Sequence, residues 1–518
     1  MKKYLILVFL FLLFIILYPP NGFSQKEGIE TKYKILTQVL RYIRDNYVEE
    51  KDIGEVLENG IDLMLKNLDP YSDLLSPKEW KELEISTKGK FGGIGIQVDI
   101  RDNFPTVISP LEGTPAYRVG LRPGDKIIEV NGESTEGWSI EKTVNTLRGE
   151  PGTQVNLKIK RIGIDEPFDV KIIREIIEIK PIPVAEIFEN DIGYIKITNF
   201  SENLTSELIA ACDSLKNKGM KKIIIDLRLN PGGLLNQAVE AAEIFIEKNE
   251  EIVFTKGRGE GILEKYNAIE DNGIYEKMPL VVLINRGSAS ASEIFAGAIQ
   301  DLDRGIVIGD TSFGKGSVQR IFPLDAGYKL KLTTAYYYLP SGRTIHRTKR
   351  TKSLLESLKM EEEPRKVRET EKLVQEIPKF KTVHLKRVVF GEIGVIPDIV
   401  IKEREFSKFS QNLARKNYFF NFANEYYAKT KKKEVIDEVI EEFYKYVTSK
   451  EKDIKREDFE KSKEEIKILL EAELWEKEKG LKGRYEVSLK YDDVFKKAIE
   501  ILKKSEKKED VFSYLKGR

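Results

Sequence analysis

The chain has 518 residues, which is long enough for several domains that each bury a core. Its 86 Lys and Arg residues nearly balance its 85 Asp and Glu residues, so no overall charge favours binding to nucleic acid or to an acidic substrate. A single cysteine, Cys212, excludes an intrachain disulfide, and with only two histidines the composition disfavours a zinc site. We therefore expect no metal and no nucleic-acid partner.

The N-terminal segment has the features of an export signal. Lys2 and Lys3 precede an uncharged apolar run at residues 4–18, and Gly22 and Ser24 occupy the −3 and −1 positions of a cleavage site after Ser24. A retained membrane anchor is the alternative, because a run of this length is short for a membrane-spanning helix without excluding one. Under both interpretations of residues 1–24, we expect the rest of the chain to be extracytoplasmic, in the periplasm or the cell envelope.

A helical pattern comes next, and a strand pattern follows it. Residues 30–88 repeat apolar side chains every three or four positions, as in "YKILTQVLRYIRDNYV", which predicts helices. From Gly89 the pattern changes to alternating strands and glycine-rich turns such as "RPGDKIIEVNG". This change predicts a small β-barrel at residues 89–176.

Residues 177–402 have an α/β pattern. The apolar runs "IGYIKI", "KKIIIDLR" and "PLVVLIN" alternate with helical stretches, which is typical of a sheet covered by helices on both faces. A charged, irregular insertion occupies residues 344–389 before "GVIPDIVI" restores the strand pattern. Residues 403–518 are rich in Lys and Glu with helical spacing, which favours solvated helices without chemistry of their own. The predicted fold class is an α/β multidomain protein with N-terminal helices and a helical C-terminal extension.

The stretch "NRGSASASEIF", Asn285 to Phe295, places serines where a helix follows a buried strand. The N–H groups of a first helical turn are free to bind an anion, and the helix dipole favours negative charge there. A nucleophile beside an oxyanion hole needs this arrangement. The alternative is that the serines only cap the helix.

A nucleophilic serine needs a base, and the two histidines do not favour a Ser-His-Asp triad because both lie in the irregular region. Lys315, in the glycine-rich stretch "GDTSFGKGSVQ", is a better candidate, because burial favours the neutral form of a lysine. The same stretch nearly matches a nucleotide-binding P-loop. However, Gly316 stands where that loop needs Ser or Thr to hold Mg²⁺, so a P-loop nucleotidase is the weaker alternative.

Several motifs together resemble the carboxy-terminal processing peptidases, or tail-specific proteases, which are serine–lysine endopeptidases that carry a PDZ domain. "LDPYS" resembles their N-terminal helical signature, with Tyr71 where His is common, and "GKFGGIGI" with "SPLEGTPAYRVGLRPGDKIIEVNG" resembles their PDZ domain. Successive parts of their protease core, which has a ClpP/crotonase-like fold, resemble "IGYIKITNF", "IIIDLRLNPGG", "GSASASEIFAGAIQD", "TSFGKGSVQ", "LPSGRTIH" and "GVIPDIVI". The resemblance runs from about Ile35 to Ile401. The long insertion and the helical tail beyond Glu403 depart from the shortest members.

The resemblance implies roles for individual residues. Ser290 is the implied nucleophile, Lys315 the general base and Gln319 the residue that orients the lysine. The implied oxyanion hole consists of the backbone N–H of Ala291 and that of one glycine, Gly232 or Gly233. In the PDZ domain, a loop is expected to bind a substrate carboxylate through backbone N–H groups beside an exposed strand edge, and it comprises Gly92, Gly93, Ile94, Gly95 and Ile96.

The implied function is that of an exported, ATP-independent serine endopeptidase that needs no cofactor. It would bind protein or peptide substrates by their free C-termini and cleave near them. An alternative from another class is a PDZ adaptor with a non-catalytic protease-like core, and the joint presence of Ser290, Lys315 and Gln319 argues against it. Membrane anchoring and homo-oligomerisation stay open.

Overall fold

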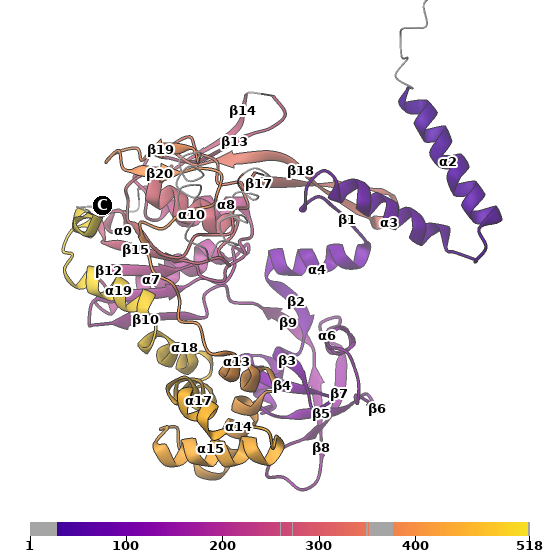
Figure 1. The fold of residues 1–518 in the computed structure, drawn as a ribbon, viewed down its shortest axis with the longest axis vertical. Coiled ribbons are helices and arrows are strands. Elements are labelled where there is room, and N and C mark those ends of the chain that lie inside the picture. The colour runs from indigo at the N-terminus through magenta and orange to yellow at the C-terminus, as the bar shows by residue number, and fades with distance from the viewer. Residues whose placement is uncertain (1–27, 260, 272, 349–350, 352–376, 516–518) are drawn as a thin grey trace, which may run out of the picture. The chain divides into compact units, whose positions relative to one another are not determined.

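The computed structural model describes residues 28–259, 261–271, 273–348, 351 and 377–515 (Figure 1). The predicted export segment and most of the charged insertion lie outside these residues. The described chain divides into two compact units. One contains the residues up to Ser76 together with Ile321–Leu332, and the other contains Pro77–Arg320 and the chain from Thr333 onward. No helix within the described part of the chain has the length and apolar character needed to span a membrane.

The first unit contains two amphipathic helices, α2 (Ile29–Asn46) and α3 (Ile53–Lys66), and the short strand β1 (Asp73–Leu75). Asp52 caps α3 by accepting a hydrogen bond from a backbone N–H in its first turn. β1 pairs antiparallel with the beginning of β18 (Lys329–Tyr338). The apolar side chains of α2 are exposed in the single chain, among them those of Tyr33, Leu36, Val39 and Tyr42.

The second unit begins with helix α4 (Pro77–Lys88) and a small β domain. The main sheet of this domain has the strand order β3-β4-β5-β7-β8, with β6 on β5. Its elements are β3 (Ile96–Arg101), β4 (Phe104–Pro110), α5 (Pro115–Arg118), β5 (Lys126–Val130), β6 (Glu133–Ser134), α6 (Ile140–Leu147), β7 (Gln154–Lys160) and β8 (Phe168–Ile173). β2 (Lys90–Gly93) pairs antiparallel with β9 (Glu175–Glu178). Alternate residues of β7 are buried, as the alternating sequence predicts.

A six-stranded sheet with the order β10-β11-β12-β15-β16-β21 forms the centre of the second unit. β10 is antiparallel to β11, and the other neighbouring strands are parallel. The strands are β10 (Val184–Phe188), β11 (Ile192–Lys196), β12 (Lys222–Asp226), β15 (Leu280–Ile284), β16 (Ile306–Gly309) and β21 (Ile399–Val400). Every residue of β11, β12, β15 and β16 is buried. This explains their continuous apolar runs, because both faces of a parallel sheet are covered.

Helices cover the two faces of this sheet. On one face, Ile223 and Ile225 of β12 pack in a cluster with α7 (Leu204–Asn217), α8 (Leu235–Glu243) and α10 (Ala291–Asp301). Cys212 of α7 is fully buried in this cluster. On the other face, Ile224 packs with α19 (Asp493–Lys503), which follows β12 by more than 200 residues. The predicted two-sided sheet is confirmed, and its second layer comes from the C-terminal extension.

The remaining strands flank this core. β13 (Glu251–Lys256), β14 (Ile262–Asn267) and the later part of β18 form an antiparallel sheet, and β17 (Ser317–Pro323) also pairs with β18. Short elements complete this region: α9 (Ile274–Lys277), η1 (Asp325–Gly327), β19 (Lys379–Lys381) and β20 (Val388–Phe390).

The C-terminal extension is a packed helical domain, so the prediction of solvated helices is wrong. It contains α13 (Lys408–Arg415), α14 (Tyr418–Thr430), α15 (Asp437–Lys450), α16 (Arg456–Lys461), α17 (Lys463–Lys479), α18 (Leu481–Lys490), α19 and η3 (Lys508–Leu515). The first five of these helices enclose a core rich in aromatic residues, with Phe419, Phe422, Phe443 and Phe459. Many of the Lys and Glu residues face solvent, while the aromatic residues supply buried area that stabilises the helices.

Candidate active site

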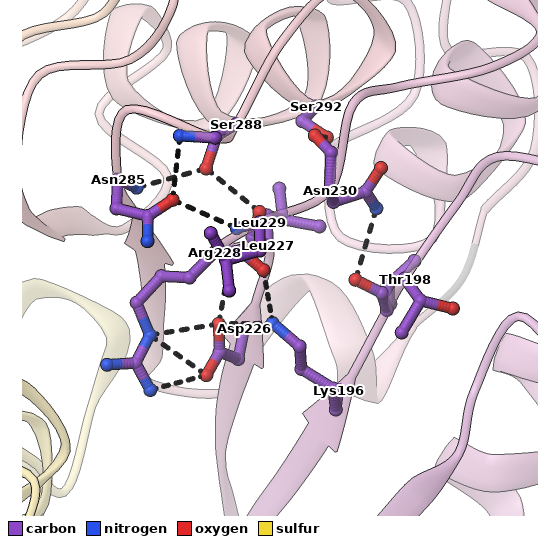
Figure 2. Close-up of polar contacts among 12 residues, drawn as sticks. Lys196, Thr198, Asp226, Leu227, Arg228, Leu229, Asn230, Asn285, Ser288 and Ser292 are labelled. Carbon is purple, nitrogen blue, oxygen red and sulfur yellow. Dashed lines mark hydrogen bonds and ion pairs between the residues drawn. The ribbon is translucent and has the colours of Figure 1, made fainter. Parts of the chain in front are cut away.

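The parallel strands β12 and β15 lie side by side, and each ends in a turn at the same edge of the sheet (Figure 2). Hydrogen bonds join the two turns, so each limits the movement of the other. The Leu229 N–H donates to Asn285 Oδ1 (2.9 Å), and the Ser288 hydroxyl donates to the Leu227 carbonyl (2.8 Å). The Asn230 carbonyl accepts from the Ala289 N–H (3.0 Å) and from the Ser292 hydroxyl (2.9 Å). The end of a parallel strand is a common place for a catalytic site in this class of sheet.

The three serines of the second turn differ in their surroundings. Ser288 and Ser292 are fully buried, and both hydroxyls are used in the hydrogen bonds between the turns. Ser290 is partly exposed, and its φ of 54° and ψ of −113° place it in a strained backbone conformation just before α10. A serine on such a turn presents its hydroxyl at the mouth of the site beside the first turn of a helix.

The predicted oxyanion groups lie beside Ser290. Gly232 approaches so closely that a Cβ atom on it would lie 2.9 Å from Ser290 Cβ and 2.9 Å from the Ala291 nitrogen. The Gly232 N–H donates to Asn230 Oδ1 (2.9 Å), so an oxyanion contact from this group would have to replace that bond. Gly233 has a φ of 151°, and a Cβ atom there would lie 2.4 Å from the Phe200 carbonyl oxygen. Both positions therefore require glycine.

Glu293, in the first turn of α10, connects the turn that contains Ser290 to the loop between β16 and β17 that contains Lys315, here called the lysine loop. Its fully buried carboxylate accepts hydrogen bonds through Oε2 from the Ser290 N–H (2.8 Å) and from the Lys315 N–H (2.9 Å). Oε1 accepts from the Gly314 N–H (2.6 Å) and from the Ser312 hydroxyl. The structure thus joins the backbones of Ser290 and Lys315 through one acceptor atom. Burial raises the pKa of Glu293, and these four hydrogen bonds oppose that rise.

Sequence reasoning missed Glu293. The available signal was the spacing S-x-x-E from Ser290 to Glu293, which is typical of a capping box at a helix start. The structure contains this capping box, in which the Glu293 side chain accepts from the Ser290 N–H. The spacing could not indicate that the same carboxylate also holds the loop after β16.

The other two predicted catalytic residues, Lys315 and Gln319, lie in the lysine loop and in the strand that follows it. Lys315 is partly buried, and its backbone carbonyl accepts a hydrogen bond from the Tyr337 hydroxyl. The Gln319 side-chain amide, from β17, donates to the hydroxyls of Ser317 (2.8 Å) and Thr333 (3.3 Å). A Cβ atom on Gly316 would lie 2.7 Å from the His346 backbone nitrogen. This close packing accounts for a glycine where a P-loop has Ser or Thr.

Buried charges lie beneath the two turns (Figure 2). Asp226, at the end of β12, accepts from Lys196 Nζ (3.1 Å) and pairs with the Arg228 guanidinium (2.6 Å). Burial alone would raise the pKa of Asp226, but Arg228 and Lys196 hold it well below its usual range. The cluster was also missed from the sequence, although the charged ends of "KKIIIDLR" beside a fully apolar strand were a signal for it.

The small β domain carries a groove between β3 and α6. It has a volume of about 170 Å³ and is lined by Phe91, Ile94, Gly95, Ile96, Val98, Ile140, Val144, Leu147 and Arg148. Three residues of the predicted carboxylate loop, Ile94, Gly95 and Ile96, line this groove. Gly92 and Gly93 instead belong to β2, where they pair with Ile176 and Glu175 of β9.

Comparisons with known proteins cover the same regions. Three family models match the chain: Peptidase family S41 at residues 191–352, PDZ domain at residues 106–161, and Probable PDZ-protease, C-terminal helical domain, at residues 433–502.

A carboxy-terminal-processing protease from Bartonella bacilliformis is 42% identical over 323 residues, which cover 61% of this chain and 74% of that protein. The carboxy-terminal processing protease CtpA from Bacillus subtilis is 36% identical over 319 residues, or 61% of this chain and 67% of its own. Among solved structures, the photosystem II D1 C-terminal processing protease matches with 25% identity and a TM-score of 0.37, over 70% of this chain and 86% of its own.

Proposed function

Since this chain belongs to the carboxy-terminal processing proteases, a family of serine-type peptidases with a PDZ domain and an S41 protease core, we propose that Ser290 and Lys315 form its catalytic dyad. We further propose that it is an exported, ATP-independent endopeptidase that cleaves proteins near their C-termini. One observation carries the choice of nucleophile: of the three serines at the start of α10, Ser290 alone is partly exposed on a strained turn.

We propose the following reaction at Ser290. Neutral Lys315 takes the proton from the Ser290 hydroxyl, and the resulting alkoxide attacks the carbonyl carbon of the scissile bond. The Ala291 N–H and the turn containing Gly232 and Gly233 stabilise the negative charge on the tetrahedral intermediate. The Lys315 ammonium then protonates the leaving amine, which leaves an acyl-enzyme on Ser290. Water hydrolyses this ester, with Lys315 again serving as the base.

Substrate recognition is proposed to take place in the groove between β3 and α6. An extended peptide can add to the edge of β3 and place its apolar C-terminal side chain among Ile94, Val144 and Leu147. Its carboxylate would bind backbone N–H groups of the loop that contains Gly95. The carboxyl end of a protein substrate is thereby held while a segment closer to its N-terminus enters the protease core.

The location and assembly of the protein are proposals of the same kind. The charged start, apolar run and small residues of positions 1–24 support export to the periplasm or cell envelope, by a cleaved signal or a retained anchor. The exposed apolar side chains of α2 support contact with a second copy of the chain, because such a stripe is normally covered.

Substitution of the dyad tests the proposal directly. We expect Ser290→Ala to abolish cleavage of a peptide substrate and labelling by a serine-directed fluorophosphonate. Lys315→Arg keeps the positive charge but cannot supply a neutral base, so we expect kcat to fall by roughly 100-fold or more. Chelators and the absence of ATP should leave the wild-type rate unchanged.

His346 provides the decisive control, because its backbone packs against Gly316 next to Lys315. If Lys315 is the base, the rate should rise with pH as Lys315 loses its proton, and we expect His346→Gln to leave this ionisation in the pH profile unchanged. A Lys315→Arg enzyme with near-normal kcat, or loss of that ionisation in His346→Gln, contradicts the dyad. A wild-type protein that binds C-terminal peptides but is neither labelled nor active would instead be a PDZ adaptor.

A further inference from the structure

The last long helix of the chain, α19, reaches the base of the active-site turns. Its inner face packs on β11, β12 and β15, and Phe495 contacts the Tyr194 ring edge-on at 5.5 Å between centroids. The Tyr194 hydroxyl in turn donates to Asp226 Oδ2 (2.9 Å). α19 is therefore part of the protease core, and its N-terminus lies close to the buried charges beneath the serine turn.

Asp492, immediately before α19, makes contacts with both of its carboxylate oxygens. Oδ1 accepts from the backbone N–H groups of Val494 (2.9 Å) and Phe495 (3.1 Å), which caps the helix. Oδ2 lies 2.6 Å from Nη1 of Arg228. The Asp492 side chain is 17% exposed and that of Arg228 is 11% exposed, so the contact is largely shielded from water.

Asp492 gives Arg228 a second close carboxylate beside Asp226. Asp226 is a single carboxylate between two cations, Lys196 and Arg228, and all three side chains are nearly inaccessible to water. Asp492 supplies the second negative charge. Glu403 contributes less, because it lies 3.6 Å from Arg228 and is 44% exposed. Without Asp492, the buried Arg228 guanidinium would keep only one close carboxylate, Asp226, which it shares with Lys196.

Arg228 connects these carboxylates to the catalytic turn. Its guanidinium binds Asp226 and Asp492, and its carbonyl accepts a hydrogen bond from Lys196. The next residue, Leu229, has a φ of 58°, which a non-glycine residue adopts only when its surroundings hold it there. Asn230 and Gly232 follow directly, so a shift at Arg228 moves the glycine that contacts Ser290 and Ala291.

We infer that Asp492 is a positioning residue for the protease reaction, by which the C-terminal helical domain holds the oxyanion turn in its active geometry. Asp492 acts through Arg228 and touches neither substrate nor nucleophile. This inference rests on the proposed function, since it assigns the Gly232–Gly233 turn to the oxyanion hole. It makes the C-terminal helical domain a working part of the active site.

Three variants of the full-length protein separate the charge of Asp492 from its capping role. Asp492→Asn keeps a good helix cap and removes the charge, while Asp492→Glu keeps the charge and weakens the cap. Asp493→Asn is the matched control, because the neighbouring Asp493 is 61% exposed and lies 3.5 Å from Lys496. kcat and KM are measured with a fluorogenic peptide that has a free apolar C-terminus. Rates are taken per titrated active site, well below each variant's melting temperature.

We expect Asp492→Asn to lower kcat on the order of 10- to 100-fold with KM unchanged, as a small displacement of a catalytic group does. Asp492→Glu should keep most of the activity despite a lower melting temperature, and Asp493→Asn should match the wild type. Asp492→Asn with a kcat within twofold of the wild type overturns the inference, as does an Asp492→Glu enzyme that is equally impaired. The proposed function is checked separately in the same assay, where an active Ser290→Ala variant or an inactive wild type would contradict it whatever the Asp492 variants do.

Discussion

Glu293 is a buried carboxylate whose four partners are all hydrogen-bond donors. An acceptor-only group fits that arrangement, so the ionised form is the one that the site holds. The hydrogen bonds from Ser290, Ser312, Gly314 and Lys315 offset part of the cost of burying this charge. The carboxylate therefore determines how the nucleophile turn and the lysine loop face each other, without taking part in the chemistry.

Glu293→Gln places an NH₂ group where an acceptor is required. We expect kcat to fall by about 100-fold, because the Ser290 and Lys315 backbones lose their shared acceptor. The free energy of unfolding should fall by about 1–3 kcal/mol, the cost of buried donors left without partners. Glu202→Gln, which alters an exposed carboxylate of the same core, is the control. Steady-state kinetics and denaturant unfolding test the prediction, and a fully active Glu293→Gln enzyme would contradict it.

The raised pKa of Glu293 gives the wild type a specific response to acid. A raised pKa means that the folded state binds the proton more tightly than the unfolded state does. Protonation therefore favours the fold as the pH falls toward the ordinary range of glutamate, but it removes an acceptor from the site. We expect activity to decline at mildly acidic pH while far-UV circular dichroism and the melting temperature are maintained. Loss of activity and unfolding at the same pH would disprove this account.

Individual residues differ in how far the sequence predicts them. The three serines at 288, 290 and 292 are equivalent by pattern, and the family resemblance was needed to choose the middle one. The hydroxyls of Ser288 and Ser292 differ from that of Ser290 because they donate to carbonyls of the turn after β12. That turn lies about 60 positions earlier in the chain. Glu293 was missed for the same reason, because its partners Ser312 and Gly314 come from the next strand–loop unit.

The C-terminal helices show how surface charge conceals a core. α17 is rich in Lys and Glu, yet it buries Ile466 and Leu470, which pack with Phe419 and Phe422 of the aromatic helix α14. Lys477 of α17 lies 4.0 Å from the Phe420 ring centroid, and Arg101 of the PDZ domain lies 4.1 Å from the same ring. Lys477 is therefore packed against an aromatic ring, with Glu473 and Glu476 opposing the effect of its burial.

Burial lowers the pKa of Lys477 to about 8, so its charge costs stability. The unfolded state binds this proton more tightly, which means that stability is lost as the pH falls from about 10.5 towards 8. We expect Lys477→Met to raise the free energy of unfolding at pH 7 by about 1–2 kcal/mol, after allowance for solvent screening. The gain should shrink by pH 10, where the wild-type lysine is neutral. Thermal unfolding at the two pH values measures both effects, and equal gains at pH 7 and pH 10 would contradict the assignment.

On the scale of the whole molecule, the order of the domains was predictable and their layering was not. Strand periodicity indicated a small β domain and a buried α/β sheet, and the family motifs supplied their identities. No local pattern indicated that α19 returns to cover β12, because that contact joins segments far apart in the chain. The export segment and the domain boundaries stay predictions.

The PDZ groove predicts how the intact protein selects its substrates. Its lining is apolar apart from Arg148, and its loop is suited to a carboxylate. We expect a peptide that ends in free Val or Leu to bind the full-length Ser290→Ala variant at least about tenfold more tightly than its C-terminal amide, which lacks the charge. Isothermal titration with matched peptides measures the difference. A peptide ending in Asp is the control for the apolar pocket, and equal affinity for acid and amide would exclude carboxylate recognition.

The burial of Cys212 in α7 has a practical consequence. Its thiol is inaccessible, and burial raises its pKa to about 12, so almost none of it is the reactive thiolate at neutral pH. The native chain, which has no second cysteine, should therefore take up no maleimide while it is folded. A cysteine introduced at an exposed position becomes a unique attachment point for a fluorophore or spin label. Pairs of such labels, one in the PDZ domain and one in the protease core, would then report the motion of the two domains during turnover, with Cys212 contributing signal only when the core unfolds.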